Sequence, residues 1–232
     1  MKLIDNNEFI KSIYNNLERM PPEAKRDFTS INKIFLESDI NIMGGFVRDS
    51  ILEVLYGYNF PINDLDILIT DKNFVEKTNY FEKKHFSKLG GLKFKYNNFS
   101  IDLFGINQIY FLNENPFLAK NLENVLKGVD ISTSAIAYNI GKGEIYDESA
   151  MEGIYKKEVN ILNPEVMDIN STITRLIIHA DKMNFKIGEI GIKYIKENYS
   201  SKAEKEIKDY LKYKEITHLF PLVKKTLGFI LK

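Results

Sequence analysis

The junction between a short strand and the helix after it constrains the fold of this chain most. Asp39–Met43 alternates as a strand does, Gly44-Gly45 follows at once, and 46–56 has apolar residues at helical spacing. A helix leaves its first backbone N–H groups without intrahelical acceptors, and glycine lets an anion come close to them. Two adjacent glycines alone more often mark a simple turn, so the junction has to be considered together with the next strand.

Two aspartates open that next strand. Asp64 and Asp66 begin a mostly apolar segment that ends at Thr70, and strand alternation places both side chains on one face. Carboxylates this close repel each other unless a cation lies between them. Mg²⁺ is the natural partner, because it prefers oxygen ligands and is usually shared with substrate phosphates. Asp-x-Asp alone is more often a turn or a helix cap, but the preceding glycine junction favours a metal site.

A third aspartate lies within an apolar strand. Asp102 stands among apolar residues of the segment Phe99–Phe104, where burial explains an aspartate poorly. Beside Asp64 and Asp66, its carboxylate would complete a site for two divalent ions. One ion would activate an attacking hydroxyl, and the other would hold a triphosphate and the leaving pyrophosphate. Asp102 could instead cap a hairpin, and its position alone leaves both interpretations open.

The periodicity along the chain predicts a mixed α/β region followed by helices. Helices are expected at 5–19, 22–37, 71–84 (with Asp71 as N-cap) and 117–127, and from about residue 170 onward; strands are expected at 92–96, 99–104, 134–139 and 144–146. We therefore predict an N-terminal helical extension at 1–37, a mixed domain at 38–165 and a helical domain at 166–232.

Composition excludes several kinds of site. The 232 residues include no Cys and only three His, which excludes disulfides and thiolate ligands and disfavours a zinc site built on His. The net charge is zero, so overall charge does not indicate nucleic-acid binding. No apolar run reaches the roughly 18 residues that a membrane span needs, and the first residues lack the pattern of a signal peptide. We expect a cytoplasmic protein outside the membrane.

Two stretches resemble a known enzyme family. Gly44-Gly-Phe-Val-Arg-Asp-Ser-Ile-Leu52, followed by Asp64-Leu-Asp-Ile-Leu68, is similar to the head domain of class II tRNA CCA-adding enzymes and bacterial poly(A) polymerases. The segment 130–139, with Gly-Glu-Ile-Tyr-Asp at 143–147, resembles the family's Arg-Arg-Asp-Phe-Thr-Ile-Asn-Ala segment and the Gly-x-Ile-x-Asp after it. The resemblance implies an α+β fold: a polymerase-β-like nucleotidyltransferase head, with a mixed sheet and flanking helices, plus an all-helical neck-like part.

The resemblance also implies a metal-dependent chemistry. Asp64, Asp66 and Asp102 would be the catalytic acids and would bind Mg²⁺, with two ions expected. The substrate would be a nucleoside triphosphate (NTP).

The same resemblance implies a nucleotide site. Gly44, Gly45 and Arg48 would hold the triphosphate, although Arg48 could equally pair with a nearby Asp and fix its helix. Asp49 matches an Asp of the family and could be a structural cap. Asp130 matches the Asp that contributes near the nucleotide sugar.

The chain departs from the family at substrate-reading positions. Gly128-Val129 stands where the family has two arginines. The family reads the incoming base with Glu-Asp-x-x-Arg, and the corresponding segment here, which begins at Asp168, has Ile169 and Thr172, whose side chains cannot make those hydrogen bonds. The three carboxylates and both glycines are intact.

These features lead to one expected function and two alternatives. We expect Mg²⁺-dependent transfer of a nucleotide from an NTP to an acceptor hydroxyl, an RNA (tRNA-like) 3′ end, with release of pyrophosphate. The acceptor could instead be a protein or a small molecule, as in a regulatory or toxin-like enzyme. The chain could also be a non-catalytic descendant that binds nucleotide or RNA. The sequence does not indicate an oligomeric state.

Overall fold

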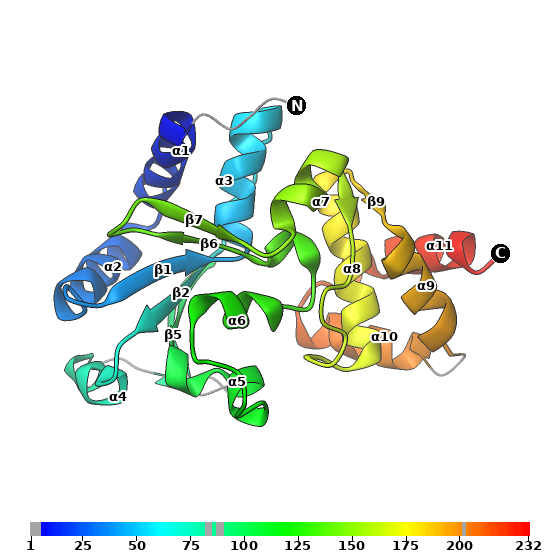
Figure 1. Cartoon of the computed structure of the whole chain (residues 1–232). Coiled ribbons are helices and arrows are strands. Elements are labelled where there is room, and N and C mark those ends of the chain that lie inside the picture. Colours follow the sequence, from blue (N-terminus) through cyan, green and yellow to red (C-terminus); the bar gives the residue numbers. More distant parts are fainter. Residues whose placement is uncertain (1–5, 82–84, 87–90, 201–202) are drawn as a thin grey trace. The chain divides into compact units, whose positions relative to one another are not determined.

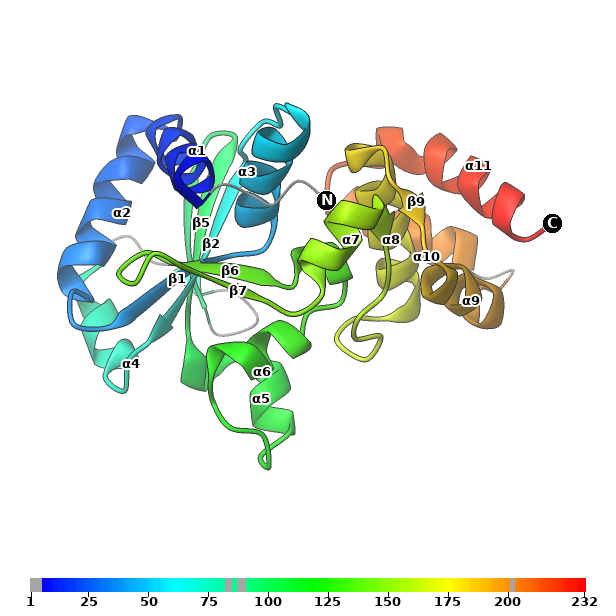
Figure 2. The same cartoon turned by 45° about the horizontal axis from the view of Figure 1, so that its top comes forward.

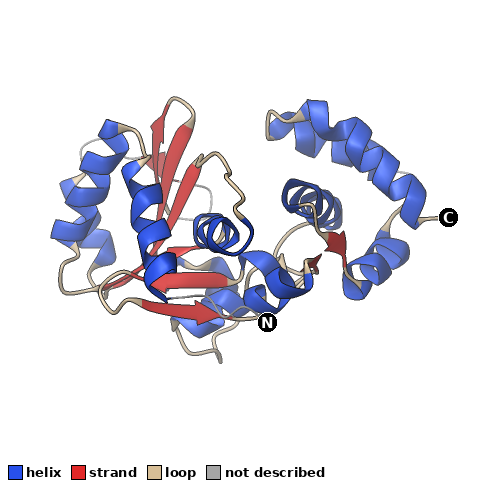
Figure 3. Cartoon of the chain, turned by 90° about the horizontal axis from the view of Figure 1, so that it is seen from above, coloured by secondary structure: helices blue, strands red, loops and turns tan. Residues whose placement is uncertain are grey.

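The computed structural model describes residues 6–81, 85–86, 91–200 and 203–232. Contacts divide the chain into two compact units: unit 1 consists of Met1–Lys127 and Ser134–Glu148, and unit 2 of Gly128–Thr133 and Ser149–Lys232. Strands gather in unit 1, whereas helices make up most of unit 2 (Figure 3). The α+β fold class expected from the sequence is confirmed.

A seven-stranded sheet with the order β3-β4-β5-β2-β1-β6-β7 forms the centre of unit 1. Its strands are β1 (Asp39–Met43), β2 (Asp64–Thr70), β3 (His85–Phe86), β4 (Leu92–Tyr96), β5 (Phe99–Gly105), β6 (Ile136–Asn139) and β7 (Glu144–Asp147). The neighbouring strands β2 and β5 run parallel, whereas the other neighbouring pairs are antiparallel. The sheet is therefore mixed, as predicted.

Three helices cover one face of this sheet: α1 (Asn6–Glu18), α2 (Pro22–Ile34) and α3 (Gly45–Tyr56) (Figures 1 and 2). Phe9 of α1 packs edge-to-face against Tyr138 of β6, with ring centroids 5.5 Å apart. Leu65 and Ile67 of β2 are buried. Because side chains alternate along a strand, Asp64 and Asp66 lie on the opposite face of the sheet, which we call the site face.

The site face is covered at one end by α5 (Tyr110–Glu114) and α6 (Leu122–Lys127) (Figure 2). Leu112 and Val125 from this region pack with Leu68 of β2 and with Ile106 in one buried apolar cluster. Leu68 is two residues beyond Asp66 on the same strand and therefore on the same face. The cluster thus covers the sheet next to the aspartates, while Asp64 stays exposed and Asp66 partly exposed.

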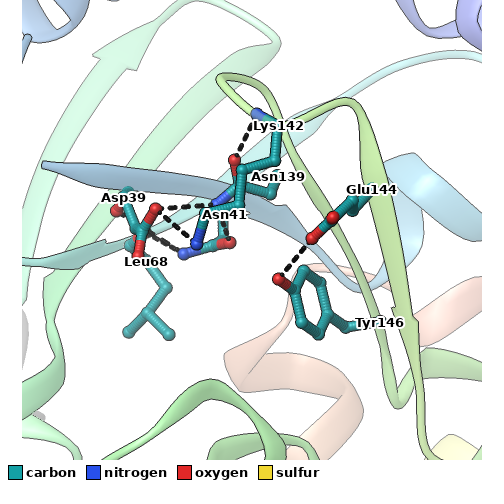
Figure 4. A network of polar contacts seen from close by, with 7 residues as sticks. All are labelled: Asp39, Asn41, Leu68, Asn139, Lys142, Glu144 and Tyr146. Carbon is teal, nitrogen blue, oxygen red and sulfur yellow. Dashed lines mark hydrogen bonds and ion pairs between the residues drawn. The ribbon is translucent and has the colours of Figure 1, made fainter.

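A buried amide pair specifies the register between β1 and β6. Asn139 Nδ2 donates a hydrogen bond to Asn41 Oδ1 at 3.0 Å, and the backbone N–H of Lys142 donates to Asn139 Oδ1 at 2.8 Å (Figure 4). Lys142 Nζ also lies 2.9 Å from Asp39 Oδ1. A shift in register would separate the two amides and leave them buried without these partners, which is costly.

Two predicted helices are wrong in extent. Instead of a helix at 71–84, a four-residue α4 (Phe74–Lys77) is followed by a 3₁₀ turn at 78–80, and residues 82–84 lie outside the described residues. The Asp71 carboxylate accepts hydrogen bonds from the Asn73 N–H at 2.7 Å and from Lys77 Nζ at 2.6 Å. It therefore stabilises a local turn and does not cap a long helix.

The helix predicted at 117–127 begins later, at Leu122. The side chain of Asn121 accepts a hydrogen bond from the backbone N–H of Asn124 at 2.9 Å. An Asn that accepts from the N–H three residues ahead is a typical helix N-cap, so the helix starts directly after Asn121.

Unit 2 is built around α8 (Ile169–Met183), which contacts α9 (Glu189–Asn198), α10 (Ala203–Tyr213) and α11 (Phe220–Ile230). A shorter helix, α7 (Ala150–Lys156), and a two-stranded parallel sheet, β8 (Glu158–Val159) with β9 (Lys186–Ile187), complete it. Among the described residues of the whole chain, every helix is too short or too polar to span a membrane.

Candidate active site

The structure brings the three predicted carboxylates to neighbouring positions on the site face. Asp66 on β2 is the register partner of Asp102 on β5, and Asp64 is the partner of Ser100. Neighbouring strands lie about 4.8 Å apart, and register partners point to the same face. Asp66 and Asp102 are partly exposed, whereas the residues that flank each of them in sequence are buried. The strand pairing therefore places Asp102 beside Asp66.

The glycine junction lies beside Asp66. Gly44 links β1 to α3 with φ 66° and ψ −129°, a backbone conformation that glycine adopts far more readily than other residues. A methyl group on Gly44 would lie 3.6 Å from Asp66 Oδ2. The Gly44 N–H donates to the Ile136 carbonyl at 2.9 Å, so it serves the sheet. The N–H groups of the first turn, from Gly45 onward, have no intrahelical acceptors and are the ones suited to an anion.

Arg48 pairs with a neighbouring aspartate, as one of the two sequence interpretations held. Its side chain is only 3% exposed. Nε donates to Asp49 Oδ1 at 2.8 Å, and Nη1 donates to Ser134 Oγ at 3.3 Å. The bond to Ser134 connects α3 to the segment that leads into β6. Arg48 and Asp49 thus hold the junction together, and a contact of Arg48 with a triphosphate stays a prediction.

Asp130 lies in unit 2, whereas Asp64, Asp66 and Asp102 lie in unit 1. Arg175 of α8 binds both of its oxygens, Nε at 2.5 Å and Nη2 at 3.1 Å. Burial alone would lower the pKa of the Arg175 guanidinium, but the charge of Asp130 raises this pKa above its ordinary value. A paired, bidentate arginine gives Asp130 a structural role within unit 2, and its contribution near a nucleotide sugar stays a prediction.

Two further residues of this region were not predicted as site residues from the sequence. Ser134, which receives the Arg48 hydrogen bond, lies just before β6. Lys93 of β4 is the register partner of Asp102, and its Nζ lies 2.6 Å from Asp102 Oδ2. The alternation of Leu92–Tyr96 placed Lys93 opposite the buried residues Leu92 and Phe94, but which strand would lie beside it depended on the sheet order.

The donor chemistry of the site fits a hard divalent cation. Carboxylate oxygens are the usual protein ligands of Mg²⁺, and Asp66 and Asp102 present them from adjacent strands. Within the described part of the chain, no three His, Cys, Asp or Glu side chains are grouped closely enough to hold a metal ion, and Lys93 engages Asp102. Side-chain movement would therefore accompany ion binding, and the metal-ligand assignment stays a prediction.

Comparisons with known proteins identify the fold. No model of a known protein family matches the sequence, and no curated protein sequence matches it. A solved structure of a tRNA-processing enzyme in an apo form has a TM-score of 0.63 at 19% identity, covering 91% of this chain and 57% of that one. A tRNA nucleotidyltransferase complexed with a primer tRNA and an incoming ATP analogue has the same TM-score at 19% identity, covering 87% and 59%.

A third similar structure is the Thermotoga maritima CCA-adding enzyme complexed with tRNA, with a TM-score of 0.57 at 18% identity, covering 90% of this chain and 53% of that one. The chain thus spans a little more than half the length of these proteins. The resemblance seen in the sequence is confirmed at the level of the fold: the chain has the fold of these solved tRNA-processing enzymes, with a mixed-sheet part and a helical part.

Proposed function

We propose that the protein is a nucleotidyltransferase that joins a nucleotide from an NTP to an acceptor hydroxyl and releases pyrophosphate. The observation that carries the proposal is the register pairing of Asp66 with Asp102, next to Asp64 and the start of α3. Like charges at directly opposite positions destabilise a sheet. Their presence on a face that is only partly covered supports a site for a cation and a phosphate-bearing ligand.

The residues of the site have separate proposed roles. Asp64, Asp66 and Asp102 would hold Mg²⁺, as two ions, and bound Mg²⁺ would neutralise charge that develops on the transferring phosphate. The acceptor hydroxyl gives up its proton to solvent and its oxygen forms a bond to the α-phosphorus, while the bond from that phosphorus to the pyrophosphate oxygen breaks. The start of α3 would stabilise the phosphates through its N–H groups and its dipole, with Gly44 and Gly45 allowing close approach.

An RNA 3′ end of the tRNA type is the proposed acceptor. Its support is the fold, because similar structures include enzymes complexed with tRNA, together with the intact carboxylates and glycines of this chain. The hydroxyl of such an end is chemically the nucleophile that this reaction requires.

A protein or a small molecule is the second candidate acceptor. Gly128-Val129 replaces two arginines of the resembling family. The Asp168 carboxylate accepts from the Ser171 N–H at 2.9 Å and from its hydroxyl at 2.6 Å, and Thr172 is fully buried. Asp168 and Thr172 thus help to form the start of α8. Together with the absence of the two arginines, this favours a transferase that does not select C and A as CCA-adding enzymes do.

The test is incorporation of label. The purified chain is incubated with Mg²⁺ and each NTP labelled at the α-phosphate, first with total RNA and then with cell protein. Label in tRNA supports the first acceptor, and label only in protein supports the second. Asp64→Ala removes a proposed ligand, while Glu123→Ala on α6, exposed and paired with Lys127, is the matched control with normal activity. Wild type equal to Asp64→Ala with every acceptor would refute the proposal.

A further inference from the structure

Lys93 continues a row of charged side chains across the site face. Register pairs join Asp66 to Asp102 and Asp102 to Lys93 on three adjacent strands, β2, β5 and β4. The Lys93 ammonium lies 2.6 Å from Asp102 Oδ2, and the two side chains are 32% and 15% exposed. The carboxylate in the middle of the row therefore has a like charge on one side and a protein cation on the other.

In this position, Lys93 provides the positive charge beside Asp102 that a bound divalent ion would otherwise provide. An ammonium at hydrogen-bond distance compensates one carboxylate and relieves its repulsion with the neighbouring one. A divalent ion bound to the same carboxylate would meet the positive charge of Lys93 within a few ångströms. Lysine has a flexible four-carbon stem and a compact charge, so it can leave the carboxylate when a stronger cation arrives.

We propose that Lys93 and a divalent cation compete for the Asp102 carboxylate, so that Lys93 sets the cation affinity of the site. The inference rests on the proposed function, because it takes Asp66 and Asp102 as cation ligands. Lys93 is a positioning residue in this scheme: it holds Asp102 in place without the ion and gives it up when the ion binds.

The strand offers a matched control in Lys95. It lies two residues beyond Lys93 on β4, so it shares the site face, and its register partner is Ser100. Lys95 is exposed. Removing Lys95 changes the net charge by the same amount as removing Lys93 but leaves the ion pair with Asp102 in place.

The experiment measures Mn²⁺ binding to the full chain without nucleotide, by the loss of the free-ion signal in electron paramagnetic resonance. The variants are Lys93→Met, Lys93→Arg, Lys95→Met and Asp66→Asn. We expect Lys93→Met to tighten binding at least about tenfold, because a nearby unit charge is removed. Lys93→Arg should stay close to wild type, Lys95→Met should change binding by no more than about twofold, and Asp66→Asn should weaken it.

The outcomes separate this inference from the proposed function. If Asp66→Asn weakens binding while Lys93→Met leaves it unchanged, or if Lys95→Met tightens it as much as Lys93→Met, only the competition is refuted. If no saturable binding occurs in wild type and Lys93→Met, or if Asp66→Asn has no effect, the metal site itself is refuted and the competition with it.

A second measurement uses the wild-type chain, so it does not depend on whether a variant folds. Acetic anhydride acetylates free amines, and mass spectrometry reads the extent at each lysine of the wild-type chain. Saturating Mn²⁺ should raise the acetylation rate of Lys93 several-fold and leave that of Lys95 unchanged. Equal rates at Lys93 with and without Mn²⁺ would overturn the competition.

Discussion

Asp66 and Asp102 occupy directly opposite positions on two parallel strands of the central sheet. Such an arrangement brings two like charges close together, and the ammonium of Lys93 relieves part of their repulsion. Natural sequences keep unfavourable local features mainly at functional sites. We therefore expect the pair to matter more for activity than for stability, and variants of Asp66 can be used to measure both effects.

Replacing Asp66 with Asn should lower nucleotide transfer while leaving the fold stable. The substitution removes the negative charge next to Asp102 and keeps a polar side chain of similar shape, so the free energy of unfolding should stay within about 1 kcal/mol of the wild-type value. Nucleotide incorporation should fall at least about 100-fold, as when a charge-stabilising group is removed from an active site. Urea unfolding and label incorporation measure the two effects. A variant that retained more than a tenth of wild-type transfer would contradict the assignment.

Gly44 and Gly45 should respond differently to alanine. The φ of 66° at Gly44 strains any residue with a Cβ, so Gly44→Ala should lower the free energy of unfolding by roughly 1–3 kcal/mol. Gly45 is the first residue of α3, and an added methyl would lie 3.4 Å from Arg48 Nη2. Gly45→Ala should therefore stay within about 1 kcal/mol of wild type. Urea unfolding measures the free energy of unfolding of both variants. Equal losses in the two would show that the backbone conformation at Gly44 does not cause the destabilisation.

Removing one member of the buried amide pair should destabilise unit 1. Asn139→Ala leaves the Asn41 amide, 1% exposed, without its side-chain partner, and an unpaired buried polar group costs about 1–3 kcal/mol. The double variant Asn41→Ala/Asn139→Ala should lose less than the sum of the single variants, because the partners act together. Additive losses in the unfolding free energies would exclude this coupling.

Asp71 should make stability depend on pH in the acid range. Burial alone would raise the pKa of its carboxylate, but hydrogen bonds from Lys77, Ser38 and the Asn73 N–H lower this pKa below the ordinary value of 3.8. Since the pKa is lower in the folded than in the unfolded chain, the contribution is complete above 3.8 and is lost as the pH falls through the folded-state value.

Wild type and Asp71→Asn should therefore differ most in unfolding free energy at about pH 6, and the difference should shrink below pH 3.8. Urea titrations at several pH values measure it. A difference that stayed constant down to about pH 2 would show that the carboxylate charge does not contribute.

Local patterns in the sequence predicted the strands and the main helices of unit 1. Alternation at Asp39–Met43 and at Leu92–Tyr96, and the glycine junction before α3, correspond to β1, β4 and the start of α3. These features depend on residues a few positions apart, whose periodicity reflects helix and strand geometry directly. The placement of Asp64 and Asp66 on one face follows from the same geometry.

The lengths of the helices after Asp71 and before Lys127 did not follow from such patterns. Helical periodicity continued through 78–84 and 117–121, but side chains of Asp71 and Asn121 form local hydrogen bonds that end or delay the helices. Short polar side chains compete with helical backbone bonding in this way, and the tertiary structure decides which alternative prevails.

By itself, the sequence determined that two aspartates share a strand face near a glycine-lined helix start. The tertiary fold decided that β5 lies beside β2 and β4 beside β5, which brings Asp102 to Asp66 and Lys93 to Asp102. It also decided that Arg48 donates a hydrogen bond to Ser134 and that Asp130 is held by Arg175. The physical reason is that strand order and ion pairing join residues far apart in the chain, and local periodicity contains no information about which distant segments will meet.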